Sequence, residues 1–413
     1  MDIKKVSPVK ILYLCHRIPY PPNKGDKIRS FNEVRYLAAR HELDLLCLAD
    51  DPGDLKYRAE LEKICRRVEV FPLDPTRAKA RGLLSLAKGN SLSAGYFHQR
   101  DMQQCCDRLL QEGDYDAVLC FSSTMAEYLF RAAPQNKSPR RVMDFCDVDS
   151  DKWLQYAAES RAPMAWLYRL ENRRLADYER RIYLAFDHSL LISEAEALLF
   201  RRICPEAREV AVIPNGVDYD YFSPEREDAR ILPVDTPNLV FTGAMDYHAN
   251  VDGVLWFCRE IWPVLKGQFP ELRFTIVGGK PTPAVLALAK LDGVAVTGFV
   301  DDVRPYYRDA DVCVIPLRLA RGVQNKVLEA LAMGKSAVAT AKANAGIQAE
   351  DGTHLRLADS PRDFAAAVVA LLHDRGERER LGGNARCFVT QHYDWATNME
   401  KLEKLLMAPT GWI

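Results

Sequence analysis

Short apolar runs that have the character of strands alternate with amphipathic stretches along nearly the whole chain. In the first half these runs are residues 10–16, 43–49, 68–73, 117–122, 142–147, 189–193 and 210–214; in the second half they are residues 239–243, 274–278, 294–300, 312–316 and 337–340. Alternation of strand and helix is typical of parallel sheets with helices on both faces. The sequence therefore predicts an α/β chain with two doubly wound, Rossmann-like domains.

The length of the chain supports two domains rather than one. At 413 residues it exceeds what a single hydrophobic core normally covers. We expect an N-terminal domain over residues 1–210 and a C-terminal domain over residues 215–390, joined by a proline-punctuated linker within residues 214–237. By analogy, the last helix, about residues 392–413, is expected to return and pack on the first domain.

Composition excludes several classes of protein. The 57 acidic and 56 basic residues nearly balance, which argues against a dedicated nucleic-acid-binding protein. No apolar run approaches the roughly 20 residues that span a bilayer, and residues 11–15 are too short for a signal peptide, so a cytoplasmic location is expected. The 11 cysteines and 8 histidines show no metal-ligand spacing, which favours a reduced protein without a metal site.

The segment 312–340 carries the most informative pattern. It reads as a buried strand, a polar loop, a helix over about residues 323–333 that stops at Gly334, and a second strand. Asn325 and Glu329 share a helical face, with Lys326 beside them. Free N–H groups and Lys326 at a helix start suit a diphosphate, and Glu329 could accept both hydroxyls of a ribose. The alternative is an ordinary amphipathic helix with Glu329 in solvent.

Loops that follow other predicted strands carry further candidates, because ligands of open parallel sheets bind outside the carboxyl ends of the strands. Gly25 and Asp26 follow the first strand, where Asp26 is placed to cap a helix; a plain strand-to-helix loop is the alternative. Gly243 ends the run of residues 239–243, and Asn250 follows it at the entry to a helix. Asp147, the last residue of the run 142–147, faces the expected site together with its neighbour Asp149, although Asp149 or Ser150 could equally be a helix cap.

Four stretches of sequence, in order, resemble the retaining glycosyltransferases of the GT-B fold, family four. They are VIPNGVDYDYFSP (residues 212–224), VTGFVDDVRPYYRDADVCVIPL (residues 296–317), NKVLEALAMGKSAVAT and LGGNARCFVTQHYDW. More narrowly, HRIPYPPNKGDKIRSFNEVRYLA, DFCDVDSDKW and ARGVQNKVLEALAMG resemble the sugar transferases of bacterial exopolysaccharide loci of the PEP-CTERM type.

The resemblance implies transfer of a sugar from a nucleoside diphosphate sugar to a saccharide or lipid-linked acceptor, with retention and without a metal or other cofactor. It implies that Glu329 binds the donor ribose. It also implies that backbone around Gly298, Phe299 and Val300 lies beside the base. Gly25 and Asp26 would approach the donor phosphates and sugar.

The sequence departs from the family at one site. Many members have two glutamates separated by seven residues, but the position eight before Glu329 is Arg321. The Arg and Lys that many members carry after the glycine matching Gly243 are also missing. We therefore expect Arg318, Arg321 and Lys326 to neutralise the diphosphate, with Gly322 in the same loop. Arg321, Lys326 and Asp147 are the residues expected to act in catalysis.

The lost glutamate leaves two other functions open. The chain could be a non-catalytic subunit of a polysaccharide-assembly complex that has kept the fold. Less well, it fits a sugar-nucleotide epimerase on the same architecture.

Two segments mix cationic and apolar residues at helical spacing. Residues 76–89 and residues 164–186 could each lie on the anionic inner leaflet of a membrane. Each could instead be a helix that covers the core and exposes a basic side, and this is favoured for the second segment.

Overall fold

The computed structural model describes residues 7–22, 25–133, 138–225, 230–233, 236–320 and 322–408. The chain divides into two compact units. Unit 1 contains Met1–Pro214 and Ala396–Ile413, and unit 2 contains Asn215–Trp395.

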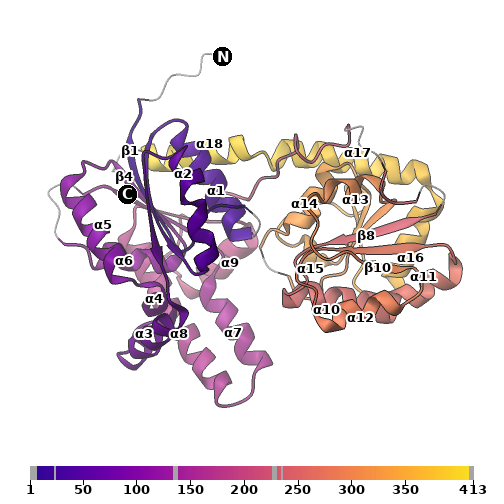
Figure 1. Cartoon of the computed structure of the whole chain (residues 1–413), viewed down its shortest axis with the longest axis horizontal. Helices are drawn as coiled ribbons and strands as arrows, with labels where there is room; N and C mark the ends of the chain where they lie inside the picture. Colours follow the sequence, from indigo (N-terminus) through magenta and orange to yellow (C-terminus); the bar gives the residue numbers. More distant parts are fainter. Residues whose placement is uncertain are drawn as a thin grey trace. The chain divides into compact units, whose positions relative to one another are not determined.

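Unit 1 is built on a parallel sheet of seven strands (Figure 1). The strands are β1 (Lys10–Cys15), β2 (Glu42–Ala49), β3 (Arg67–Pro72), β4 (Ala117–Phe121), β5 (Arg140–Cys146), β6 (His188–Leu191) and β7 (Ala211–Val212). Their order in the sheet is β3-β2-β1-β4-β5-β6-β7. The strand order reverses between β1 and β4, and at such a point an open α/β sheet offers a ligand site at its carboxyl edge.

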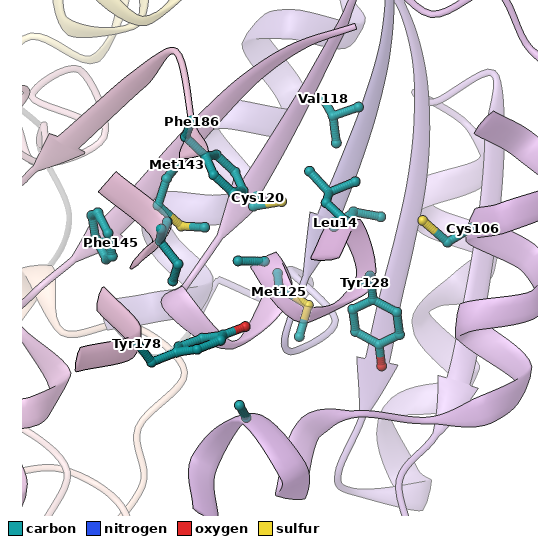
Figure 2. Packing of buried hydrophobic residues seen from close by; sticks show 14 of the residues in the cluster. Leu14, Cys106, Val118, Cys120, Met125, Tyr128, Met143, Phe145, Tyr178 and Phe186 are labelled. Carbon is teal, nitrogen blue, oxygen red and sulfur yellow. The ribbon is translucent and has the colours of Figure 1, made fainter. Parts of the chain in front are cut away.

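Helices on both faces of this sheet connect the strands. They are α1 (Gly25–Ala38), α2 (Arg58–Glu62), α3 (Pro75–Ala87), α4 (Leu92–Phe97), α5 (Arg100–Glu112), α6 (Ala126–Phe130), α7 (Asp149–Glu159), α8 (Met164–Ala185) and α9 (Glu194–Ile203). Apolar side chains from one face of the sheet pack with these helices into a core cluster, in which Leu14, Val118 and Met143 come from strands and Tyr128 and Tyr178 from helices (Figure 2). Burial of each such side chain stabilises the fold by about 1.5–3 kcal/mol.

The C-terminal helix α18 (Trp395–Met407) completes unit 1 although it follows all of unit 2 in the sequence. Its Glu403 accepts a hydrogen bond from the Tyr36 hydroxyl at 2.9 Å and pairs with His41 at 2.9 Å. Asn398 donates to the Pro214 carbonyl at 3.1 Å, and Leu402 is fully buried. These contacts fix α18 to α1 and to the last residue of the N-terminal segment.

Unit 2 contains a second parallel sheet, of six strands, with the order β10-β9-β8-β11-β12-β13. The strands are β8 (Asn238–Thr242), β9 (Arg273–Val277), β10 (Val294–Val296), β11 (Val312–Ile315), β12 (Ala337–Ala339) and β13 (Arg356–Leu357). The helices are α10 (His248–Trp256), continued by a π-helical turn (Phe257–Ile261), α11 (Trp262–Gln268), α12 (Pro283–Ala287), α13 (Arg304–Asp309), α14 (Asn325–Ala332), α15 (Ala341–Asn344), α16 (Pro361–His373) and α17 (Arg375–His392). The order reverses between β8 and β11.

The predicted α/β architecture with two doubly wound sheets is confirmed. All twelve predicted strands are present, but β13 was not predicted, and the strand expected over residues 294–300 ends at Val296. The helix expected from residue 323 begins at Asn325. All eleven cysteines are free thiols, and most of them are buried. Within the described ranges, the chain forms no helix with the length and hydropathy that a bilayer span requires.

Candidate functional site

The reversal point of the unit 2 sheet brings two of the predicted loops together. The loop after β8 carries Gly243 and Asn250, and the segment after β11 leads into α14 with Lys326 at its second position. Because β8 and β11 are hydrogen-bonded neighbours, their carboxyl ends lie side by side. The sequence predicted this group of residues from two separate stretches, and the topology explains why they meet.

Lys326 lies at the centre of this group. Its ammonium group donates to Asn250 Oδ1 at 2.9 Å and lies 5.7 Å from the centre of the Phe241 ring. Asn250 is oriented in turn by donating to the Ala244 carbonyl at 2.9 Å. Gly243 has φ of +153°, and a Cβ there would lie 2.6 Å from Asn250 Nδ2 and 3.2 Å from Lys326 Cε. A glycine at this position is therefore needed for the lysine and the amide to pack against the backbone.

Burial sets the charge state of Lys326. Removal from water lowers its pKa to about 8, although the nearby carboxylate of Glu329 acts in the opposite direction. The charge of Glu329 offsets the cost of burying the ammonium group only in part. An anion that binds beside Lys326 would therefore stabilise its charged form. The site is thus prepared for a negatively charged ligand.

Glu329 is positioned by a chain of hydroxyl groups. Its Oε2 accepts a hydrogen bond from Tyr307 at 2.9 Å, and the Tyr307 hydroxyl is also hydrogen-bonded to Thr242 at the end of β8. Burial raises the pKa of Glu329, against the lowering effects of Tyr307 and Lys326. The alternative that Glu329 is a solvated surface residue is wrong, since its carboxylate is withdrawn from water and accepts the hydrogen bond from Tyr307.

The start of α14 has spare hydrogen-bonding capacity. Its N-cap residue, Gln324, makes no side-chain capping hydrogen bond. Asn325 Oδ1 is buried and has no hydrogen-bond partner among the described residues. A helix start with these properties can bind an anion through its N–H groups.

The basic loop before α14 is only partly as predicted. Arg318 is exposed and forms a two-bonded ion pair with Asp252 of α10, with Nε 3.0 Å from Oδ2. Gly322 has φ of +56°, and its carbonyl oxygen lies 2.1 Å from where a Cβ on Gly346 would stand. Arg321 lies outside the described residues. The guanidinium of Arg318 is thus at least partly engaged by Asp252.

The loop over Gly298, Phe299 and Val300 follows β10, two strands from β8. Gly298 has φ of +72° and accepts a hydrogen bond from the Gly278 N–H at 3.1 Å. Gly278 in turn is so close to Gly243 that a Cβ on it would lie 1.7 Å from the Gly243 carbonyl oxygen. The Phe299 side chain is 78% exposed. The carboxyl edge of β10, β9 and β8 therefore forms one connected set of loops.

In unit 1, the reversal point also brings charged residues together. Asp26 lies in the first turn of α1, next to Gly25, and pairs with Arg17 at 2.9 Å and with His16 at 3.6 Å. Burial alone would raise the pKa of Asp26, but the hydrogen bonds and charges of His16 and Arg17 outweigh it and lower the pKa well below its usual value. Asp26 is thus a fixed anion, and its Oδ1 accepts from the Lys27 N–H at 3.0 Å.

Asp147 and Asp149 follow β5 and share one cation. Lys152 lies 2.8 Å from Asp149 and 3.4 Å from Asp147. Asp147 Oδ1 is buried without a hydrogen-bond partner in the described part of the chain. The suggested capping role of Asp149 or Ser150 is wrong: the N-cap residue of α7 is Val148, whose N–H donates to Glu196 at 2.8 Å.

The carboxylates that do cap α7 come from other helices. Glu179 of α8 accepts from the Ser150 N–H at 3.0 Å and from the Ser150 hydroxyl. Burial, assisted by Asp149, raises the pKa of Glu179 to about 8; burial and Asp147 raise that of Glu196 to about 7. Sequence reasoning missed these residues, because a capping group more than twenty residues away leaves no local pattern.

The predicted residues thus lie at the carboxyl edges of the two sheets. Unit 2 brings together Gly243, Asn250, Lys326 and Glu329, and unit 1 contains Asp26 and Asp147 at its own carboxyl edge. Within the ranges that are described, no three or more His, Cys, Asp or Glu side chains are arranged to hold a metal ion.

Two family models match the chain, one in each half. The model described as "Glycosyl transferase 4-like domain" matches residues 30–216, and the model described as "Glycosyl transferases group 1" matches residues 236–374. A Klebsiella pneumoniae protein described as an "Uncharacterized 44.6 kDa protein in cps region" is 21% identical over 398 residues, covering 93% of this chain and 96% of that protein.

Solved structures share the fold over nearly the whole chain. Sucrose-phosphate synthase from Thermosynechococcus elongatus superposes with a TM-score of 0.70 at 17% identity, covering 96% of this chain and 98% of that one. HepE from Anabaena, in complex with UDP and glucose, superposes with a TM-score of 0.66 at 16% identity, covering 97% and 100%. WaaG, described as a glycosyltransferase involved in lipopolysaccharide biosynthesis, gives 0.65 at 16%, covering 97% and 100%.

Proposed function

We propose, from the premise that this chain belongs to the glycosyltransferases of the GT-B fold, that it moves a sugar from a nucleoside diphosphate sugar to a saccharide or lipid-linked acceptor. The structural neighbours solved with UDP, glucose and UDP-glucose support a donor of this class. The involvement of WaaG in lipopolysaccharide biosynthesis supports an acceptor that belongs to a surface polysaccharide. Bacterial exopolysaccharide synthesis, on the cytoplasmic side of the inner membrane, is the setting we propose.

The observation that carries the proposal is Lys326 at the start of α14. Burial lowers its pKa to about 8, the charge of Glu329 offsets this only in part, and the ammonium group donates to the neutral Asn250 at 2.9 Å. The side chain of the N-cap residue, Gln324, does not cap the helix start beside it. A diphosphate would neutralise this cation and accept from the N–H groups of the helix.

The ribose and the base of the donor would contact residues near Lys326. Glu329, held through Oε2 by Tyr307, would accept the hydroxyls of the ribose. The exposed ring of Phe299, at the connected carboxyl edge of the same sheet, offers an apolar face beside the base. Gly243 would allow the donor to approach the backbone of the β8 loop.

In the reaction, the nucleoside diphosphate leaves and negative charge grows on its β-phosphate oxygen. Lys326, Arg321 and the start of α14 would stabilise that charge as it develops, without a metal ion or another cofactor. Asp147, with a buried oxygen that lacks a partner, would position the acceptor or the sugar. We propose that the anomeric configuration is retained. The acceptor oxygen bonds to the anomeric carbon on the face that the diphosphate leaves, as the bond between that carbon and the phosphate oxygen breaks, and the departing phosphate takes the hydroxyl proton.

Nucleotide binding tests the proposal first. Thermal unfolding with UDP, GDP, ADP and TDP should show stabilisation by at least one, and titration calorimetry should show that Lys326→Met weakens this binding by a factor on the order of 10 to 100. Asp147→Asn should bind the same nucleotide normally and fail in transfer. Equal binding by wild type and Lys326→Met would contradict the proposed donor site.

Transfer assays separate the alternatives. Sugar release or transfer from the matching donor, lost in Asp147→Asn, supports a catalytic enzyme. Binding without any turnover in a panel of acceptors would favour the non-catalytic subunit, and conversion of the donor without acceptor would favour the epimerase.

A further inference from the structure

Two helical hairpins of unit 1 expose apolar side chains on neighbouring elements. On the α3–α4 hairpin, Leu83 is 54% and Leu84 56% exposed; on the α7–α8 hairpin, Trp166 is 69% exposed. Leu154, Tyr156, Met164 and Leu170 are also exposed large side chains of the second hairpin. Since α4 packs against both α3 and α8, and α7 packs against α8, the two hairpins form one connected region, named here the hairpin surface.

The charge of the hairpin surface is one-sided in its outer part. Residues 75–97 and 154–174 contain eight basic and two acidic residues, in a chain whose net charge is −1. The basic residues are Arg77, Lys79, Arg81, Lys88, Arg161, Arg169, Arg173 and Arg174. Of the two acidic residues, Glu171 is fully buried, where it caps α4 by accepting from the Leu92 and Ser93 N–H groups. The surface therefore offers many cations and little compensating charge.

The hydrogen bonds of Glu179 show which edge of the sheet the hairpin surface extends from. Ser150, which bonds to Glu179, follows the carboxyl end of β5, whereas α8 ends next to the start of β6 at the amino edge. Residues 164–178 of α8 therefore extend beyond the carboxyl edge, by about 22 Å at 1.5 Å per residue. The hairpins α3–α4 and α7–α8 lie together at the lower end of unit 1 in Figure 1.

We propose that the hairpin surface docks on a lipid bilayer that contains anionic lipids. Exposed Leu, Met and Trp side chains would enter the boundary between headgroups and acyl chains, while Lys and Arg contact the headgroups. A bilayer explains both the apolar and the basic residues, because it offers apolar depth and dispersed negative charge together. It also explains why these side chains extend from two separate hairpins, since a planar surface can contact both tips at once.

The proposal assigns a bilayer as the partner of the hairpin surface, which extends from the same edge of unit 1 as Asp147. It goes beyond the proposed sugar transfer and does not depend on it: the surface is defined by α3, α4, α7 and α8, whereas the donor residues lie in unit 2. If the acceptor is lipid-linked, the bilayer would present it to the carboxyl edge from which these hairpins extend.

Vesicle flotation with the full-length protein tests the proposal. We expect flotation with vesicles of phosphatidylcholine and phosphatidylglycerol, weaker flotation as salt rises, and little with phosphatidylcholine alone. The double variant Leu84→Ala/Trp166→Ala should lower the partition coefficient on the order of tenfold or more. The control Leu198→Ala/Leu286→Ala removes two leucines of similar exposure, 56% and 51%, outside the hairpins and should leave binding unchanged.

A second pair of variants tests the basic residues. Lys79→Ala/Arg169→Ala should reduce binding on the order of tenfold, because each cation near an anionic surface contributes several-fold. Arg259→Ala/Arg375→Ala, exposed on unit 2, is the matched control. Trp166 should also show a blue shift in fluorescence with anionic vesicles, measured as the difference between wild type and Trp166→Phe.

Three outcomes would overturn the proposal: no flotation at low salt, equal flotation by the hairpin and control variants, or a concentration-dependent dimer that Leu84→Ala/Trp166→Ala abolishes in the absence of lipid. The last would show that a second copy of the chain covers the surface. Lys326→Met should float like wild type, so failure of the donor site and failure of the docking surface give different results.

Discussion

The protonation of Lys326 should make the stability of ligand-free unit 2 depend on pH. Because burial lowers its folded-state pKa to about 8, the unfolded chain binds more protons than the folded one between about pH 8 and pH 10.5. The contribution of Lys326 to the free energy of unfolding should therefore rise with pH across that window. In Lys326→Met this rise should disappear, as measured by denaturant unfolding at pH 8 and pH 10. A similar rise in the variant would contradict the assignment.

The same residue predicts the pH dependence of nucleotide binding. A diphosphate needs the charged amine, so affinity should fall by up to about tenfold between pH 7 and pH 9 as Lys326 loses its proton. Calorimetric titration of the preferred nucleotide at both pH values measures this. Lys326→Met should bind weakly and with little change over the same range; a wild-type affinity that is constant from pH 7 to pH 9 would count against Lys326 as the diphosphate ligand.

Glu179 should have the opposite effect in unit 1, where the stability should fall as pH rises. Burial and Asp149 raise its folded-state pKa from 4.5 to about 8, so the folded chain binds the proton more tightly. The stability that the protonated group contributes is present below about pH 4.5 and is lost as pH rises through 8. Glu179→Gln stays neutral, so the fall in unfolding free energy between pH 5 and pH 8 should shrink by on the order of 1–3 kcal/mol.

Thermal unfolding at several pH values measures the effect of Glu179→Gln. Glu379→Gln, on the surface of unit 2, is the control and should unfold with the pH dependence of wild type. If Glu179→Gln and wild type showed the same pH dependence of unfolding, the raised pKa of Glu179 would be contradicted.

Site residues could be predicted from the sequence where they lie close together along the chain. Asn325, Lys326 and Glu329 could be placed on one helix start from their spacing alone. Tyr307 and Thr242, which position Glu329, could not, because their contact depends on how α13 packs beside β8. Arg318 was expected at the diphosphate, but the ion pair with Asp252, 66 residues away, was not visible in the sequence.

At the scale of elements, Gly243 and Gly278 let the backbone at the carboxyl ends of β8 and β9 approach closely. This close approach holds the loop after β8, which carries the proposed donor site. In Gly243→Ala, the new Cβ would stand 2.6 Å from Asn250 Nδ2, so Asn250 and Lys326 would have to move. We expect a loss of nucleotide affinity on the order of tenfold or more, together with lower thermal stability, measured by calorimetry and thermal unfolding.

Gly267→Ala in α11 is the matched control for Gly243→Ala. A Cβ there meets nothing within 4 Å, and alanine is favoured over glycine in a helix by about 1 kcal/mol. The control should bind nucleotide normally and unfold at the same or a higher temperature. Normal binding by Gly243→Ala would show that the contact is not needed for the site.

Strands were easier to predict than the boundaries of helices. Runs of apolar residues buried on both sides, such as Val312–Ile315, are unmistakable in a parallel sheet. The two-residue strand β13 leaves no such run, so it was missed. Helix α14 begins two residues after the predicted start, because Gln324 has an extended backbone conformation; the apolar Val323 is buried in the loop instead.

At the scale of the whole molecule, unit 1 is built from two separated segments of the chain. A truncation after Trp395 removes Glu403, which binds Tyr36 and His41, and the buried Leu402. We expect the thermal transition of unit 1 to fall by several degrees or to be lost, while that of unit 2 is unchanged, as seen by calorimetry. The family models and the fold account for the architecture, but the return of α18 could be expected only by analogy.

A control truncation after Met407 should leave both transitions in place, since it keeps all of α18. Equal loss in both truncations, or no loss in either, would contradict the role given to this helix.

The late position of α18 has a consequence for synthesis on the ribosome. Unit 2 is one uninterrupted segment, Asn215–Trp395, and can fold as soon as it emerges from the exit tunnel. Unit 1, although its first 214 residues are translated earlier, must wait with the α18-binding surface of α1 uncovered until that segment has been made. The half of the protein that starts first therefore finishes last, and nascent chains of intermediate length are the species that chaperones would meet.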